Sequence, residues 1–225
     1  MNPLNVMENT MPSMQQRHSM VGGQSDIFSC IYQQETHIVI WQRSLSTNLS
    51  QSAETILYTK PSLEISMVLS PRDAFETLQK ALGPSQASAV LSRDIAQLVD
   101  MFCSLFEQKR AVIRLSALDR TMCPRFHVDW VPCRLITTYQ GVATEWLPHN
   151  VADRSKLGTG NMGKPDELSG LFDSSSDIQQ LNCGDIALLK GEIWENNMGA
   201  GLIHRSPQLS GGNRRLLLTI DFIND

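Results

Sequence analysis

The sequence predicts an α+β fold, or a β-barrel supported by helices. Apolar residues recur at helical spacing in the first half of the chain, up to residue 108. From residue 110 onward the pattern changes to roughly eight short strand-like runs separated by turn residues. Helices that are segregated from strands in this way are typical of a mainly antiparallel sheet with helical support.

The composition is that of an ordinary soluble protein. Of the 225 residues, 41% are hydrophobic and 19% are charged, and the formal net charge is −4. Nucleic-acid-binding proteins usually carry a basic excess, so nucleic acid is not an expected partner. The five cysteines form no Cys-x-x-Cys pair, which argues against a zinc ribbon and fits a reducing compartment. With no apolar run of bilayer length and no secretory signal, we expect a cytoplasmic protein without a membrane partner.

The first half of the chain is expected to contain a tail and the start of a single domain. Residues 1–25 are polar and are predicted to form a disordered tail, while residues 26–225 form one domain. Within that domain, residues 26–109 are predicted to supply a β-hairpin and supporting helices. The hairpin strands are 26–32 and 37–41, with a polar turn between them.

Two helices are predicted after the hairpin. Ser70 and Pro71 are typical of an N-cap and a first helical position, and Gly83, followed by proline, predicts the end of that helix. A longer helix is predicted over 85–108, where apolar residues form one stripe. Residues 44–60 are polar and fit either a short helix or a loop.

Residues 110–225 are predicted to form the β core. Its strands are short apolar runs, at 111–115, 125–130, 134–139, 144–147, 186–190, 201–204 and 215–222. Residues 148–180 form a long polar connection, and such a loop in a compact domain is more often functional than neutral. This connection is therefore a candidate lid.

One of the predicted strands carries two potential metal ligands. Side chains alternate across a strand, so His127 and Asp129 point to one face, while Phe126, Val128 and Trp130 point to the other. We expect the apolar face to pack in the core, which leaves an imidazole and a carboxylate in the same space. The alternative is a buried hydrogen-bonded pair without a metal.

His204 is the best candidate for a third ligand. It ends the predicted strand 201–204, and Arg214 and Arg215 open the last strand soon after. Two histidines and one carboxylate leave positions free on Fe(II) for a bidentate co-substrate and dioxygen. A nearby guanidinium can pair with the distal carboxylate of a 2-oxo acid. Besides the metal ligands, no catalytic residue is predicted.

The register of the last strand decides which arginine faces the cavity. Arg215 shares a mixed face with Leu217 and Thr219, whereas Arg214 lies on a purely apolar face. If the mixed face lines the cavity, Arg215 binds the carboxylate of the 2-oxo acid, and if the apolar face does, Arg214 binds it. The mixed face is slightly favoured.

In order and context these motifs resemble the Fe(II)/2-oxoglutarate-dependent dioxygenases. The matching features are His127-x-Asp129, the strand 134–139, Gly184-Asp185, His204 and the arginine pair 214–215. The resemblance implies a double-stranded β-helix, which is a jelly-roll or cupin-like barrel, over residues 110–225 with N-terminal helices supporting it.

The resemblance also implies roles for individual residues. His127, Asp129 and His204 would be the iron ligands. Arg215 or Arg214 would bind 2-oxoglutarate, with Tyr139 as a further contact. The expected reaction is hydroxylation of a small molecule or a protein side chain.

The whole chain is also similar to an uncharacterised bacterial family, domain of unknown function family 1826. Its signature segments are Arg-Phe-His-Val-Asp-Trp at 125–130, Thr-Glu-Trp-Leu at 144–147 and Ile-His-Arg-Ser-Pro at 203–207. Members are often linked to zinc handling, and two histidines with an aspartate also suit Zn²⁺. Two alternatives therefore remain. One is a zinc-binding protein of zinc homeostasis without redox chemistry, and the other is a catalytically inactive β-helix that serves as an interaction domain.

Overall fold

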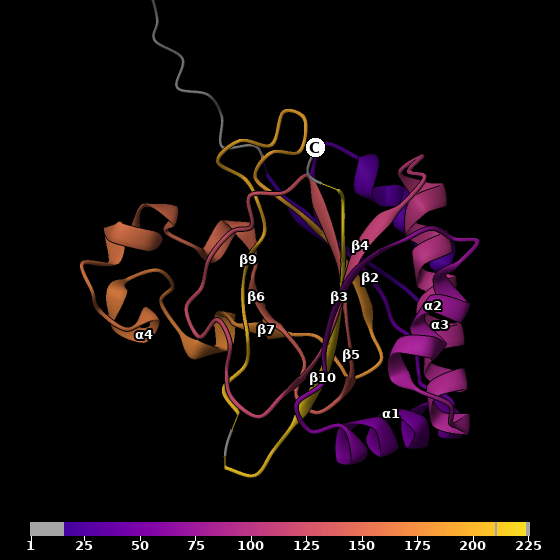
Figure 1. Ribbon diagram of the computed structural model, residues 1–225. Coiled ribbons are helices and arrows are strands. Elements are labelled where there is room, and N and C mark those ends of the chain that lie inside the picture. The colour runs from indigo at the N-terminus through magenta and orange to yellow at the C-terminus, as the bar shows by residue number, and fades with distance from the viewer. Residues whose placement is uncertain (1–15, 210, 224–225) are drawn as a thin grey trace, which may run out of the picture.

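The chain folds into a mixed α+β structure with two sheets and a layer of helices (Figure 1). The computed structural model describes residues 16–209 and 211–223. The large sheet has seven strands, in the spatial order β1 (His18–Gly22), β2 (Thr36–Trp41), β8 (Ile186–Lys190), β5 (Cys133–Gln140), β10 (Arg215–Asp221), β4 (Ala111–Leu118) and β3 (Glu64–Leu69). The small sheet has the order β7 (Gln179–Gln180), β6 (Glu145–Leu147) and β9 (Ile203–Arg205). The predicted α+β class is confirmed.

Strand β10 lies near the middle of the large sheet and pairs antiparallel with both β4 and β5. In the large sheet, only β1 and β2 pair in parallel. Leu216, Leu218 and Ile220 of β10 pack in the core beneath the helices. Because side chains alternate across a strand, Arg215 and Leu217 face the opposite side. The mixed face of β10 is therefore the one that lines a cavity.

Three helices, α1 (Thr47–Thr59), α2 (Ala74–Leu82) and α3 (Gln86–Leu105), pack against the large sheet. Figure 1 shows α2 and α3 along one side of this sheet, away from β6, β7 and β9. The long helix was predicted, and its Ser85 N-cap accepts a hydrogen bond of 3.0 Å from the amide of Ser88. The polar stretch that fitted either a helix or a loop is α1. No described helix is both long and apolar enough to cross a membrane.

A second apolar cluster joins the two sheets. Ile38, Ile136 and Leu189 from the large sheet pack with Trp146 and Leu202 from the region of the small sheet. The sheets therefore face one another, and the space beside this cluster is where polar side chains from both can meet.

The long connection 148–180 is ordered rather than a bare loop. It contains α4 (Asp166–Ser169), strand β7 and four single-turn 3₁₀ helices, η2 (His149–Val151), η3 (Arg154–Lys156), η4 (Gly158–Asn161) and η5 (Ser175–Asp177). Leu171 and Phe172 anchor it in a third apolar cluster with Phe126. Asp166 is 4% exposed and ties the connection to the segment that carries His127.

The predicted N-terminal hairpin is wrong. Residues Ser25–Tyr32 form a 3₁₀ helix, η1, because Phe28 and Ile31 are three residues apart and both bury on one side. Strand β2 pairs instead with β8 and with β1, which lies inside the stretch expected to be a tail. Residues 1–15 of that stretch lie outside the described residues. Strand β3, at the edge of the large sheet, was not predicted.

The predicted strand 125–130 is also wrong, because only His127 makes a β-bridge there. The amide of Phe126 donates to the carboxylate of Asp166, at 2.8 Å, rather than to a neighbouring strand. Phe126 is buried as expected, but Trp130 is 68% exposed. The alternation that predicted an apolar face therefore holds at one end of the segment only.

Candidate metal centre

The side chains of His127, Asp129 and His204 converge. Each offers one ligand atom, and these atoms all lie within 4.8 Å of one another. The Nε2 of His127 is 3.5 Å from Oδ1 of Asp129, and the Nε2 of His204 is 3.3 Å from Oδ2. The three residues chosen from the sequence therefore share one site.

The backbone brings the two histidines together. The amide of His127 donates to the carbonyl of His204, and the amide of His204 donates back, both at 3.0 Å. Residue His204 belongs to β9, which pairs with β6, so the bridge attaches the His127 segment to the edge of the small sheet. A single antiparallel bridge is enough to place both imidazoles side by side, with ring centroids 4.6 Å apart.

Each imidazole is oriented by its Nδ1. The Nδ1 of His127 lies 2.9 Å from the carbonyl of Arg125, and that of His204 lies 3.2 Å from the carbonyl of Leu202. A carbonyl can only accept, so Nδ1 carries the proton and Nε2 keeps a lone pair when the ring is neutral. Metal-binding histidines are commonly held in this way.

Asp129 is held in its ionised form. Burial alone would raise the pKa of Asp129, but the neighbouring His127 and His204 imidazoles, which donate to it when they are protonated, and the charge of Arg134 together bring it well below its usual range. The hydrogen bond to Asp129 in turn raises the pKa of His127. The site thus combines two imidazole nitrogens with one carboxylate, which fits Fe(II) or Zn²⁺ by ligand type.

Arg134 on β5 supports this carboxylate and was not found by sequence reasoning. Its Nη1 lies 2.5 Å from Oδ2 of Asp129, while its Nε and Nη2 donate to Asp221, at 2.7 Å and 3.1 Å. Arg134 and Asp221 are cross-strand partners on β5 and β10. Arg114 adds a further hydrogen bond to Asp221, at 2.6 Å. This chain of charges connects Asp129 to β5 and β10 of the large sheet.

A cavity of about 270 Å³ opens beside the candidate ligands. His127 and His204 line it, together with residues of β4, β5 and β10 that face the small sheet, namely Arg114, Ser116, Arg134, Ile136, Arg215, Leu217 and Thr219. The wall thus combines charged and hydroxyl side chains with the apolar side chains of Ile136 and Leu217.

Arg215 is a buried cation in this cavity. The residue is 1% exposed, and its guanidinium donates to the hydroxyls of Thr138, at 2.9 Å, and Thr144, at 2.7 Å. In the described part of the chain no carboxylate forms an ion pair with it. Burial lowers the pKa of Arg215 to about 10, which reflects the cost of an uncompensated charge.

Two other expected contacts lie elsewhere. Arg214 donates to the carbonyls of Leu57 and Pro61, at the end of α1, so the register favours Arg215 at the cavity. Tyr139 does not reach the cavity. It is fully buried on the helix side of β5, where its hydroxyl donates to Asp94 at 2.6 Å. The neighbouring Thr138, on the other face of the same strand, contacts Arg215 instead.

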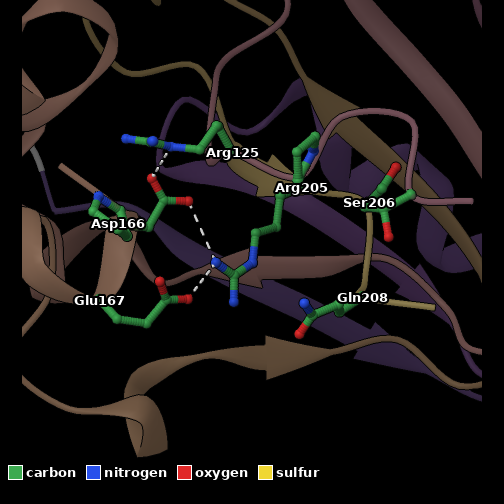
Figure 2. A pocket seen from close by; sticks show the side chains of 9 residues that line it. Arg125, Asp166, Glu167, Arg205, Ser206 and Gln208 are labelled. Carbon is green, nitrogen blue, oxygen red and sulfur yellow. Dashed lines mark hydrogen bonds and ion pairs between the residues drawn. The ribbon is translucent and has the colours of Figure 1, made fainter. Parts of the chain in front are cut away.

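A second hollow of about 300 Å³ adjoins the metal cavity, and Arg205 and Ser206 line both. Figure 2 shows the carboxylates of Asp166 and Glu167 turned toward the Arg205 guanidinium. Arg205 also pairs with Glu145, at 2.7 Å. These ion pairs hold Arg205 in place between the two hollows.

Solved structures with a similar fold share little sequence with this chain. The structure of a "Putative oxygenase" from Shewanella oneidensis has a TM-score of 0.50 at 10% identity, and the match covers 92% of this chain and 89% of that chain. A Pseudomonas putida prolyl-4-hydroxylase has a TM-score of 0.48 at 7% identity, covering 89% and 98% of the two chains. A full-length Neurospora crassa protein solved in complex with alpha-KG has a TM-score of 0.47 at 6% identity, covering 94% and 86%. Among curated proteins, none matches the sequence.

The sequence of this chain does match a protein family. Residues 22–221 match a family described as "Protein of unknown function (DUF1826)". The matched range contains all three candidate ligands and Arg215, and almost every described element. The chain is therefore a member of the DUF1826 family.

Proposed function

We propose that this protein is a non-haem Fe(II)- and 2-oxoglutarate-dependent oxygenase that hydroxylates a small molecule or a protein side chain. One observation carries the proposal. Arg215, a buried guanidinium without a carboxylate partner, lines the same cavity as His127 and His204. A metal site alone does not require such a cation, whereas a dicarboxylate co-substrate does.

His127, Asp129 and His204 would hold the iron. Their donors are two imidazole nitrogens with free lone pairs and an ionised carboxylate, a set that suits Fe(II) and leaves coordination positions free. When bound, Fe(II) with 2-oxoglutarate and dioxygen supplies hydroxylation of a C–H bond, with succinate and carbon dioxide as the other products.

Arg215 would bind the distal carboxylate of 2-oxoglutarate. Thr138 and Thr144 accept hydrogen bonds from its Nε and Nη2 and so fix the plane of the guanidinium before the ligand arrives. Ile136 and Leu217 line the same cavity and keep part of its wall apolar. A low-dielectric surrounding strengthens the pairing between the guanidinium and a carboxylate.

The fold suits this chemistry. We assign the two facing sheets to a double-stranded β-helix, with helices α1–α3 as its support. The likeness to the Shewanella oneidensis protein described as an oxygenase concerns the fold, and it supports the same function here. The hollow in Figure 2 adjoins the metal cavity through Arg205 and Ser206, and the substrate would reach the metal from that side.

The direct test is turnover without a substrate. Protein purified anaerobically is loaded with Fe(II), given 2-oxoglutarate and oxygen, and assayed for succinate. We expect slow succinate formation that needs both Fe(II) and 2-oxoglutarate and is strongly reduced in Arg215→Met at the same 2-oxoglutarate concentration. Stoichiometric zinc binding with no succinate would contradict the proposal and favour a zinc protein without redox chemistry. The absence of both metal binding and succinate would favour an interaction domain.

A further inference from the structure

A separate cavity of about 470 Å³ lies next to the apolar cluster between the sheets, and Ile40, Trp146 and Leu181 of that cluster line it. Arg17 and His37, from the β1–β2 edge of the large sheet, line it together with residues of the segment around β7. This cavity has no lining residue in common with the metal cavity. It is therefore a distinct place where a ligand can bind.

Arg17 is an unpaired cation in the wall of this cavity. The residue is 5% exposed, and its Nε and Nη1 are enclosed without any hydrogen-bond partner. The ion pairs in the described part of the chain do not include Arg17, whereas the partly buried Arg43, Arg134 and Arg154 each have an acidic partner. A guanidinium that is largely enclosed without a counter-ion is unfavourable, and an arriving anion would offset that cost.

Burial shifts the pKa values of the ionisable groups around Arg17. Burial, followed by the charges of His149, His18, Arg154 and Arg17, lowers the pKa of His37 to about 3. Burial also lowers the pKa of Arg17 despite the nearby charge of Glu35. His37 is therefore neutral near pH 7, which leaves Arg17 as the arginine that carries positive charge in the wall of the cavity.

Amide side chains make up much of the remaining wall. Gln42, Asn150 and Gln179 line the cavity. Asp185 also lines it, but one of its carboxylate oxygens already accepts from the backbone and side-chain nitrogens of Asn182, at 2.8 Å and 3.2 Å. The cavity thus presents a guanidinium with several neutral donors and one carboxylate that is already engaged.

We propose that this cavity binds a small polar oxyanion, such as the phosphate or carboxylate group of a metabolite, with Arg17 as the anchoring residue. The site is independent of the metal centre and of any oxygenase activity.

The test is a calorimetric titration of the full chain with inorganic phosphate and, in a second arm, with malonate. Four proteins are compared, namely the wild type, Arg17→Met, Arg215→Met and the exposed control Arg72→Met. We expect one saturable anion site in Arg215→Met, which lacks the other unpaired guanidinium, and the same site in the wild type and Arg72→Met. The affinity of this site should fall by at least about tenfold in Arg17→Met. The anion that binds more tightly identifies phosphate or carboxylate as the recognised group.

Thermal unfolding supplies a second readout. The binding anion should raise the Tm of the wild type but not that of Arg17→Met. If Arg17→Met does not fold, Gln42→Glu replaces it, because a carboxylate in the same wall should compete with the anion and weaken its binding. Equal anion affinity in Arg17→Met and Arg72→Met would overturn the proposal. So would the absence of saturable binding of both anions to the wild type. A failure of the succinate assay alone does not contradict this anion site, because Arg215→Met is expected to bind the anion as the wild type does.

Discussion

Arg134 lies 2.5 Å from Oδ2 of Asp129, the same oxygen that His204 approaches to 3.3 Å. The guanidinium therefore engages one carboxylate oxygen and leaves Oδ1, next to His127, more accessible to a metal ion. Because Arg134 is itself fixed by Asp221, the candidate metal centre is tied to the large sheet through an ion pair as well as to the small sheet through its backbone.

Arg134→Gln should weaken metal binding. The variant removes the cation that holds Asp129 in place, and loss of such a supporting contact typically costs about 10- to 100-fold in metal affinity. Titration with Fe(II) or Co(II) under anaerobic conditions measures the effect. The matched control is Arg114→Gln, because Arg114 contacts Asp221 but forms no ion pair with Asp129. Equal affinity in the two variants would show that Arg134 does not support the site.

Arg215→Met should separate co-substrate binding from metal binding. We expect the KM for 2-oxoglutarate to rise by more than about tenfold, because a desolvated guanidinium–carboxylate pair is lost, while metal affinity stays the same. Arg214→Met is the control, since Arg214 donates to backbone carbonyls near α1. A larger effect of Arg214→Met on this KM would reverse the assignment.

Asp166→Ala should loosen the segment that carries His127. Asp166 accepts hydrogen bonds from the amide of Phe126 and from Arg125, both at 2.8 Å. Hydrogen bonds to a buried charged group contribute about 1.5–3 kcal/mol each, so chemical denaturation should show a loss of at least that size, with weaker metal binding. Asp173→Ala, at an exposed position, serves as the control and should change neither quantity.

Lys190 should make stability depend on pH. Burial, followed by the charge of Arg17, lowers the pKa of Lys190 to about 8, although its ammonium donates to the carbonyl of Gln33 at 2.8 Å. The folded state therefore holds the proton less tightly than the unfolded chain, and stability rises with pH between about 8 and about 10.4.

The matching measurement is the Tm of the wild type and of Lys190→Met across that pH range. We expect the Tm of Lys190→Met relative to that of the wild type to be highest near pH 7, where the folded wild type still carries the enclosed charge. As pH rises, the Tm difference should shift in favour of the wild type. Lys109→Met, at an exposed position, controls for general alkaline effects. A Tm difference between wild type and Lys190→Met that stays constant with pH would contradict this account.

The candidate ligands were predictable although their local structure was not. Strand alternation placed His127 and Asp129 on one face, and a single bridge at His127 is enough to produce that outcome. The rest of the segment is held by Asp166, some 40 positions later in the chain, and no local pattern signals such a contact. Trp130, at the other end of the segment, is exposed rather than buried.

The supporting residues depend on pairing between distant strands. Arg134 meets Asp221 because β5 and β10 are neighbours in a particular register, which a single sequence does not reveal. Alternation along 134–139 does carry one signal, since Tyr139 has the opposite parity to Arg134 and Thr138. Applying it would have excluded Tyr139 from the cavity and placed Thr138, which contacts Arg215, on the cavity side of the strand.

The claim that His127, Asp129 and His204 form one metal centre is tested most directly by metal stoichiometry. Anaerobic titration of the full chain with Fe(II) should give one tightly bound ion per wild-type chain. It should give none in the variant that combines His127→Ala with His204→Ala, provided that circular dichroism shows this variant folded. One equivalent of Fe(II) bound by the folded double variant with unchanged affinity would contradict the account.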